Sequence, residues 1–144
     1  MGRLIAIACA PAKRAPLVEQ PEALVSVAGG IAGDVRGPKR GRQITMLFRE
    51  GWEAACLDLG AALPWVTRRA NLLVEGVATP REGGRLAIGG VILEVTGETY
   101  PCHLMEAAHR GLREALTPDW RGGVTCNVVT GGTIAAGDAV ESLP

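Results

Sequence analysis

A cysteine at the junction of a predicted strand and a predicted helix is the residue of this sequence best placed to do chemistry. Residues 91–96 are apolar and rich in β-branched side chains, which is typical of a buried strand. Downstream, four apolar residues recur at every fourth position and predict a stripe along one helix face. They are Leu104, Ala108, Leu112 and Leu116. Pro101 suits a first helical position, so Cys102 is expected in or beside the first turn, among unpaired backbone N–H groups.

A cysteine at a helix start can do several kinds of chemistry. The positive end of the helix dipole stabilises the thiolate, which is the form that acts as nucleophile and as metal ligand. A thiolate at Cys102 can attack sulfur, carry a persulfide or coordinate a soft metal. A structural interpretation stays open beside these, because free cysteines are often buried as small apolar side chains.

The other three cysteines, Cys9, Cys56 and Cys126, are far apart in the sequence, and no C-x-x-C pair occurs. This spacing argues against a zinc knuckle. The apolar run of residues 4–10 is short for a signal peptide and is soon followed by basic residues. No run reaches the length of a membrane span. We therefore expect a cytoplasmic protein with no membrane partner.

A second candidate feature is the glycine-rich segment 31–42, which carries four positive charges within seven residues. Backbone N–H groups and arginine side chains of such loops bind anions. The segment lacks the G-x-x-x-x-G-K-[ST] spacing of a nucleotide P-loop. A solvated flexible loop is the alternative interpretation.

Charge is also unevenly distributed along the chain, although its net charge is zero. Residues 1–70 hold ten Lys/Arg against six Asp/Glu, and residues 71–144 hold five against nine. This asymmetry favours a local anion site over a nucleic-acid surface. Two adjacent arginines, Arg68 and Arg69, lead toward the predicted strand 72–75. Because side chains alternate along a strand, we expect one of them to face a pocket and the other to be a surface charge.

The pattern of elements predicts a mainly β protein that forms one domain over residues 1–144. Seven segments read as strands. They are residues 4–9, 24–28, 43–48, 72–75, 85–88, 91–96 and 124–129, with two short strands after residue 131. Gly89-Gly90 is a two-residue hairpin signal. Helices are predicted at residues 50–59 and after Cys102, too few for a parallel βαβ sheet. A mixed, largely antiparallel β-barrel with two or three attached helices is consistent with this. Trp52, Cys56 and Cys126 are predicted to be packing residues.

Several blocks of the sequence resemble the MOSC domain family, named for the C-terminal domain of molybdenum cofactor sulfurases. The blocks occur in family order over residues 3–142. They are residues 30–34 (GIAGD), 42–45 (RQIT), 69–76 (RANLLVEG), 88–89 (IG), 95–97 (VTG) with 101–102 (PC), 121–124 (RGGV) and 137–138 (GD).

The resemblance implies a β-barrel like that of a pyruvate kinase domain and assigns roles to several residues. Cys102 matches the family's characteristic cysteine. In molybdenum-containing relatives, including the amidoxime-reducing proteins, that cysteine ligates the metal of a pterin cofactor; in the sulfurases it has been proposed to handle sulfur. By the same resemblance, the residues that fall near the pterin or its phosphate are Arg42, Arg69 and Asn71. Arg68 is a further candidate for binding the cofactor beside them. Gly33 and Asp34 fall on the loop that frames the pocket.

The sequence also departs from its larger relatives. The cofactor-binding reductases carry an N-terminal β-rich domain, and the sulfurases carry a pyridoxal-phosphate-dependent desulfurase domain; neither is expected here. No pyridoxal phosphate site is therefore expected. Many family members have a histidine soon after the Gly-Asp pair, whereas this chain continues Val35-Arg36-Gly37. Its two histidines, His103 and His109, lie on the predicted Cys102 helix. His103 is a candidate for assisting protonation, although adjacent helical residues do not face each other.

Three functional hypotheses follow. In the first, the protein binds a molybdenum-pterin cofactor or handles sulfur through Cys102, with an enzymatic form that reduces N-hydroxylated compounds. In the second, it is a non-catalytic module that delivers sulfur or cofactor and docks on a cysteine desulfurase or a redox partner protein. In the third, Cys102 is a packed residue of a scaffold that has lost its chemistry. The expected ligand is a small anionic cofactor, and no nucleic acid is expected to bind.

Overall fold

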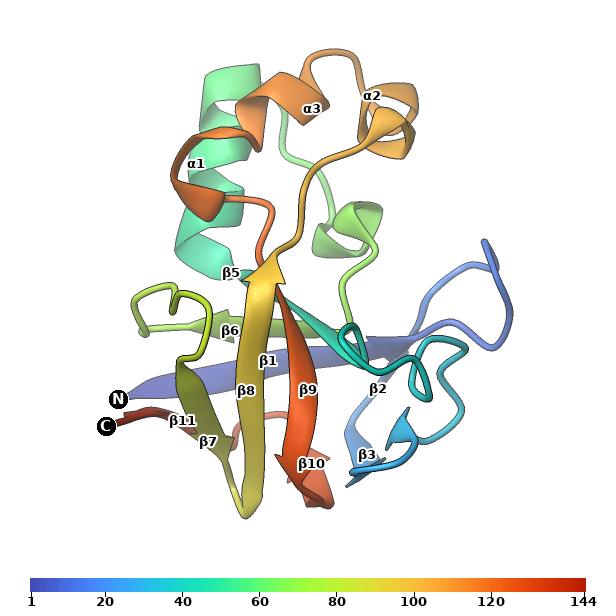
Figure 1. Ribbon diagram of the computed structural model, residues 1–144. Helices are drawn as coiled ribbons and strands as arrows, with labels where there is room; N and C mark the ends of the chain where they lie inside the picture. The colour runs from blue at the N-terminus through green and yellow to red at the C-terminus, as the bar shows by residue number, and fades with distance from the viewer.

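Seven strands close into a β-barrel in the computed structural model, which describes residues 1–144 (Figure 1). The strands are β1 (Gly2–Cys9), β5 (Ile44–Phe48), β6 (Leu72–Glu75), β7 (Arg85–Ile88), β8 (Val91–Glu98), β9 (Val124–Thr130) and β11 (Ala139–Leu143). Around the barrel the order is β1-β6-β5-β9-β8-β7-β11, and β11 pairs with β1 to close it. Only the β5–β6 pair is parallel. The predicted mixed, largely antiparallel barrel is confirmed.

Four further strands lie outside this barrel. β2 (Val18–Gln20) pairs with the end of β1, beyond the part that pairs with β11. A separate three-stranded sheet has the order β10-β3-β4. Its members are β3 (Glu22–Ser26), β4 (Gly30–Ile31) and β10 (Gly132–Ala135).

The helices gather at one end of the barrel, at the top of Figure 1. They are α1 (Arg49–Leu59), α2 (His103–Ala108) and α3 (Leu112–Ala115), with two 3-10 turns, η1 (Trp65–Arg68) and η2 (Pro118–Trp120). Two clusters of buried apolar side chains result. One fills the barrel, and the other joins the helices to the outer faces of β5 and β6 through residues such as Leu47, Leu73 and Trp52. No helix has the length and apolar character needed to span a membrane.

Alternation along the strands explains which side chains fill the barrel. On β9, Val124, Cys126 and Val128 are fully buried, as predicted for Cys126. β5 is buried on both faces, because the helices cover its outer side. The predicted hairpin is also confirmed: Ile88 pairs with Val91 across Gly89-Gly90, and Gly89 has φ +56°.

The single helix predicted after Cys102 is wrong, because the chain breaks it into α2 and α3. His109 has an extended backbone (φ −159°), and Gly111 adopts φ +86°, a left-handed conformation suited to glycine. The break turns Leu112 onto the helix cluster, while Ala108 of the predicted stripe is exposed. The other predicted helix is confirmed and ends at Gly60, which has φ +73°.

The turn before β9 gives a sharp test of the fold. Gly123 has φ +93°, and a Cβ added there would overlap the carbonyl oxygen of Met46 on β5. Gly123→Ala should therefore lower the free energy of unfolding by about 3 kcal/mol or more, since backbone strain and overpacking combine. Urea denaturation followed by circular dichroism measures this.

Gly137→Ala is the matched control for that variant. Gly137 has φ +98°, but a Cβ there would meet no atom within 4 Å. Gly137→Ala should therefore lower the free energy of unfolding only by the cost of backbone strain, about 1–2 kcal/mol. Equal losses in the two variants would contradict the close approach of β5 to the turn before β9.

Candidate functional site

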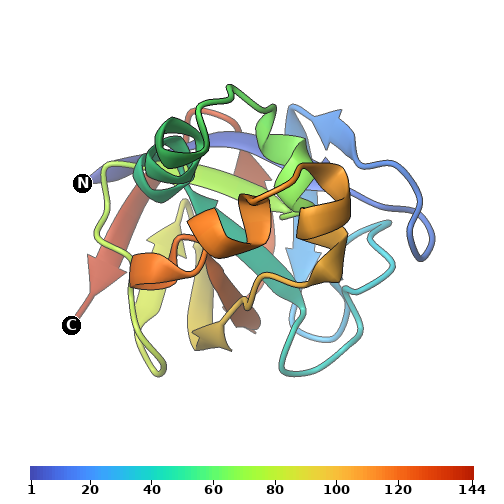
Figure 2. The ribbon, with the colours of Figure 1, turned by 90° about the horizontal axis from the view of Figure 1, so that it is seen from above.

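Three loops and the segment before α2 enclose a hollow at one rim of the barrel. The loops are β1–β2 (residues 10–17), β4–β5 (residues 32–43) and the turn between η1 and β6 (residues 69–71). Figure 2 shows the first two loops and α2 on the same side of the molecule.

The hollow has two adjoining parts that share four lining residues. The outer compartment has a volume of about 420 Å³, and the cysteine compartment, which contains Cys102, has about 240 Å³. Arg36, Arg42, Arg69 and Leu104 line both. These three arginines, the junction arginines, therefore lie where the two compartments meet.

Positive charge is concentrated in this hollow. Seven of the fifteen Lys and Arg side chains line it. They are Lys13, Arg14, Arg36, Lys39, Arg42, Arg68 and Arg69. None of them forms an ion pair, since the ion pairs of the molecule involve Arg49, Arg85 and Arg121. Asp34 is the only carboxylate among the lining residues. An unneutralised cluster of this kind attracts anions.

Arg68 is a buried cation beneath the cysteine compartment. Its Nε donates to the carbonyl oxygen of Gly122 (3.0 Å) and its Nη2 to that of Thr99 (2.9 Å). Burial lowers the pKa of Arg68 to about 10; repulsion from Arg36 and Arg42 acts in the same direction, and negative charge on Cys102 opposes it. The guanidinium is still charged at neutral pH, and it ties the segment before Cys102 to the turn before β9.

Arg69 follows Arg68 directly in the sequence, but its backbone and side chain take a different course. It ends η1 in a left-handed conformation with φ +65°, and its Nη2 donates to the carbonyl oxygen of Ala15 (2.8 Å). The prediction that one of the two arginines is a surface charge is wrong, because both line the cysteine compartment. A 3-10 turn and a left-handed residue replace the strand alternation on which that prediction rested.

Asn71 lines the outer compartment, but its side chain is bonded to the barrel. Its Oδ1 accepts from the backbone N–H of Thr45 (3.0 Å), and its Nδ2 donates to the carbonyl oxygen of Ala8 (3.1 Å). The side chain therefore holds β1, β5 and the start of β6 together. Its bonding pattern is that of a positioning residue for the loops around the hollow.

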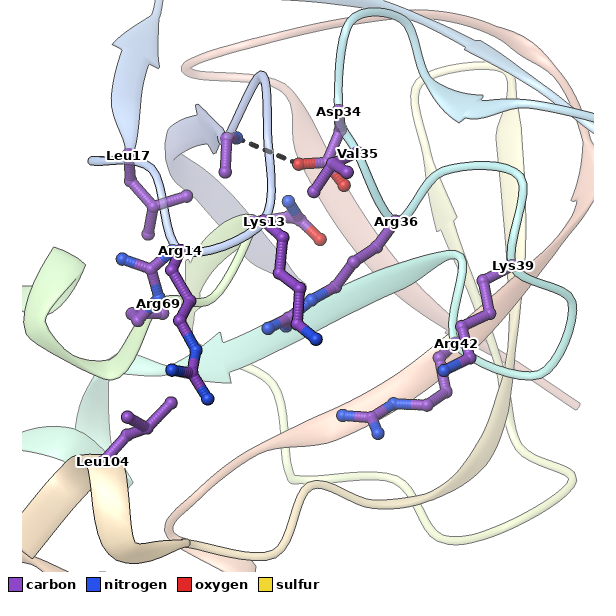
Figure 3. Close-up of a pocket in the computed structure, with 12 residues that line it drawn as sticks. Lys13, Arg14, Leu17, Asp34, Val35, Arg36, Lys39, Arg42, Arg69 and Leu104 are labelled. Carbon is purple, nitrogen blue, oxygen red and sulfur yellow. Dashed lines mark hydrogen bonds between the residues drawn. The ribbon is translucent and has the colours of Figure 1, made fainter.

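Gly33 and Asp34 differ in their relation to the hollow. Gly33 is exposed, has φ +84° and does not line either compartment. Asp34 is buried in the wall of the outer compartment, where its Oδ1 accepts from the backbone N–H of Ala10 (3.0 Å; Figure 3). Its Oδ2 has no hydrogen-bond partner. The carboxylate fixes the β1–β2 loop against the β4–β5 loop.

Cys102 is half-buried at the N-cap of α2 and lines the cysteine compartment with four arginines. Because α2 has only six residues, the charges around the thiol come mainly from these side chains and not from the helix. Cys9 and Cys126 are buried in the core; burial raises the pKa of Cys9 to about 11, with Asp34 contributing, and that of Cys126 to about 12. Cys56 is half-buried on α1, outside the hollow.

The two histidines do not join Cys102. His103 is exposed and is not among the lining residues, and His109 Nδ1 lies 3.0 Å from the carbonyl oxygen of Arg110. Sequence reasoning missed the site role of other residues. Lys13 and Arg14 lie in a segment without a recognisable motif, and Tyr100, 76% exposed beside the thiol, carried no signal.

Comparison with known proteins agrees with this fold. The family model of the MOSC domain matches residues 34–141. YuaD from Bacillus subtilis has 22% sequence identity and a TM-score of 0.79, over 97% of this chain and 94% of that one. YiiM from Geobacillus stearothermophilus has 16% identity and a TM-score of 0.77, over 100% of this chain and 76% of that one.

YiiM from Escherichia coli is similar as well, with 15% identity and a TM-score of 0.70 over 99% of this chain and 70% of that one. At such identities the likeness concerns the fold. Comparison with curated proteins finds no match. Because the family model covers more than half of the sequence, the chain belongs to the MOSC domain family.

Proposed function

We propose that the hollow binds a molybdenum-pterin cofactor, or carries sulfur destined for one, with Cys102 as the residue that holds the metal or the sulfur. The MOSC family is associated with molybdenum cofactor binding and sulfur handling. One observation carries the proposal: a free thiol and seven basic side chains outside any ion pair line two compartments that have four lining residues in common.

The residues of the hollow fit an anionic cofactor with a soft metal. Guanidinium groups bind phosphate through paired, charge-assisted hydrogen bonds, so the junction arginines Arg36, Arg42 and Arg69 are proposed to hold the phosphate. A thiolate is a suitable ligand for a soft metal, which assigns that role to Cys102. The Thr99 hydroxyl, buried in the wall without a hydrogen-bond partner, is a further polar group of the site.

When bound, the metal would supply redox chemistry that no side chain of the hollow provides, and reduction of N-hydroxylated compounds is the activity proposed for that form. The chain's own contribution is to bind and orient. Arg68 holds the segment before Cys102 through two carbonyl oxygens, and Asn71 holds the loops of the outer compartment. Leu104 and Met105 give the cysteine compartment an apolar side.

In the sulfur-handling form, the thiolate of Cys102 attacks the outer sulfur of a donor persulfide. A new S–S bond forms on Cys102, the S–S bond of the donor breaks, and the donor leaves as a thiolate with the electron pair of that bond. The proton stays on the transferred sulfur, and no external oxidant or reductant is needed. The arginines around the compartment stabilise the attacking thiolate of Cys102.

The first test measures cargo on the protein. The wild type should carry pterin and molybdenum after purification, or gain the mass of one sulfur atom on Cys102 after incubation with a cysteine desulfurase and cysteine. Cys102→Ser should abolish the gain, and Cys56→Ser, which alters a half-buried thiol outside the hollow, should leave it unchanged. Mass spectrometry and metal analysis check this. A wild type that takes up neither cofactor nor sulfur would contradict the proposal.

A second test measures how strongly the positive charges of the hollow act at the Cys102 thiol. Iodoacetate is an anion and iodoacetamide is neutral, so the ratio of their alkylation rates reports attraction of anions to Cys102. Removing two charges in Arg36→Gln/Arg42→Gln should lower this ratio by about tenfold, because electrostatic steering changes association rates by 10-fold or more. Cys9 and Cys126 should stay unlabelled at neutral pH, being buried with pKa values raised to about 11 and about 12.

The control for this charge change is Arg110→Gln/Arg113→Gln, which removes two exposed charges away from the hollow. It should leave the ratio unchanged. A ratio at Cys102 that falls equally in both double variants would show that net charge, and not the hollow, attracts the reagent.

A second candidate function is delivery to or from a partner protein, and the exposure of Tyr100 favours it. Tyr100 is 76% exposed and lines the cysteine compartment, so a docked desulfurase or redox partner would contact it beside the sulfur. Tyr100→Ser should slow sulfur transfer from a cysteine desulfurase by about fivefold or more, as for an aromatic contact at an interface, without slowing transfer from inorganic polysulfide.

Leu57→Ser is the control for Tyr100→Ser, because Leu57 is 82% exposed on α1 and lines neither compartment. It should leave both rates unchanged. If Tyr100→Ser slows transfer from both donors equally, Tyr100 acts on the thiol and not on a partner, and the delivery function is contradicted.

A further inference from the structure

The outer compartment contains more positive charge than one phosphate group needs. Three cations, Lys13, Arg14 and Lys39, line this compartment and not the cysteine compartment. Cys102 does not line the compartment that contains them. A phosphate group carries a charge of about −1.5 to −2 at neutral pH, which three arginines already balance. The three outer cations keep an excess of positive charge, since the one carboxylate of the compartment, Asp34, can balance only one of them.

These cations come from two loops that hydrogen bonds hold together. Val35 donates to the carbonyl oxygen of Ala10 (2.8 Å), and Arg69 Nη2 donates to that of Ala15 (2.8 Å). A turn closed by the Ala15 N–H and the Ala12 carbonyl oxygen (3.1 Å) presents Lys13 and Arg14.

The β4–β5 loop is in turn fixed to the barrel. Gly41 donates its N–H to Asn127 Oδ1 (2.6 Å) and accepts from the Thr96 hydroxyl (2.7 Å). The positive groups are therefore held near one another before any ligand arrives, and this lowers the entropic cost of binding.

The view in Figure 3 shows how the basic side chains lie. Lys13, Arg14, Arg36 and Arg42 reach toward a common space, with Lys39 beside Arg42 at its edge. The volume of about 420 Å³ falls in the range of about 300–1,000 Å³ that holds drug-sized ligands, so the compartment has room for more than one phosphate group. Leu17 and Val35 add apolar lining for an organic group.

From this division of charges we infer that the outer compartment binds the second phosphate of a ligand that carries a diphosphate. The junction arginines hold the phosphate nearer Cys102, and Lys13, Arg14 and Lys39 hold the one farther away. The ligand class is an organic diphosphate, such as a nucleoside diphosphate or a cofactor extended by a nucleoside diphosphate. The inference rests on the proposed function in that the same ligand reaches Cys102 with its other end.

Isothermal titration calorimetry on the full chain, at constant ionic strength, tests the inference with three probes: inorganic phosphate, inorganic pyrophosphate and ADP. Pyrophosphate and ADP should bind about tenfold or more tightly than phosphate, because the second phosphate adds charge-assisted hydrogen bonds. The variant Arg14→Gln/Lys39→Gln should remove this advantage and change phosphate affinity less than threefold. Glutamine retains much of the side-chain length, and at the φ of +62° of residue 14 it carries the same strain as arginine.

Two further variants separate the compartments. Arg36→Gln/Arg42→Gln should weaken all three probes, whereas Arg110→Gln/Arg113→Gln should weaken none. Equal affinity for phosphate and pyrophosphate, or an equal loss of both in Arg14→Gln/Lys39→Gln, would overturn the inference and leave a single-phosphate site. Tight binding of pyrophosphate but not ADP would restrict the site to inorganic diphosphate and also overturn it.

The outcome is separable from that of the proposed function. These titrations do not need a reactive thiol, because none of the three probes reacts with sulfur. Conversely, sulfur uptake on Cys102 is measured without any diphosphate. If the titrations fail but sulfur uptake is normal, only the diphosphate site is contradicted. If the titrations succeed but Cys102 takes up no sulfur, the role of Cys102 is contradicted.

Discussion

Repulsion among the positive side chains of the hollow is the constraint that the surrounding structure must overcome. Like charges that lie close together oppose folding, and none of these seven forms an ion pair with a carboxylate. Backbone carbonyl oxygens supply part of the compensation, because Arg68 and Arg69 donate to Gly122, Thr99 and Ala15. Side chains of the neighbouring strands also anchor the loops that carry these charges, as Asn127 and Thr96 do at Gly41.

The barrel is suited to holding these charged loops in place because few of its strands have an unpaired edge. Seven strands close on themselves, and their inner side chains form one apolar core. The parallel pair β5–β6 requires a crossover, which consists of α1 and η1. That crossover delivers Arg68 and Arg69 to the rim where β5 begins, and Asn71 bonds to Thr45 at that point. The connection that the topology demands therefore also positions two of the arginines.

The strands could be predicted from the sequence because their signals are local. Alternation along residues 91–96 and 124–129 determines which side chains face the core, and Gly89-Gly90 determines the register of one hairpin. The break at Gly111 was missed because the spacing of the four apolar residues continues across it. The positions of Arg68 and Arg69 depend on a 3-10 turn and on hydrogen-bond partners of their side chains that are distant in the sequence. These partners are Thr99 and Gly122 for Arg68, and Ala15 for Arg69. The grouping of Lys13, Lys39, Arg69 and Cys102 is likewise a product of tertiary structure.

The pairing of β1 with β11 has a consequence for how the molecule forms. Gly2 and Arg3 lie opposite Val140 and Ala139, so the seam of the barrel joins its first strand to its last. While the ribosome is still translating residues before β11, the edge of β1 that will receive it is unpaired. The seam can form only after β11 has emerged. Closure is thus a late, long-range event, and chains stalled before it would present an adhesive strand to one another.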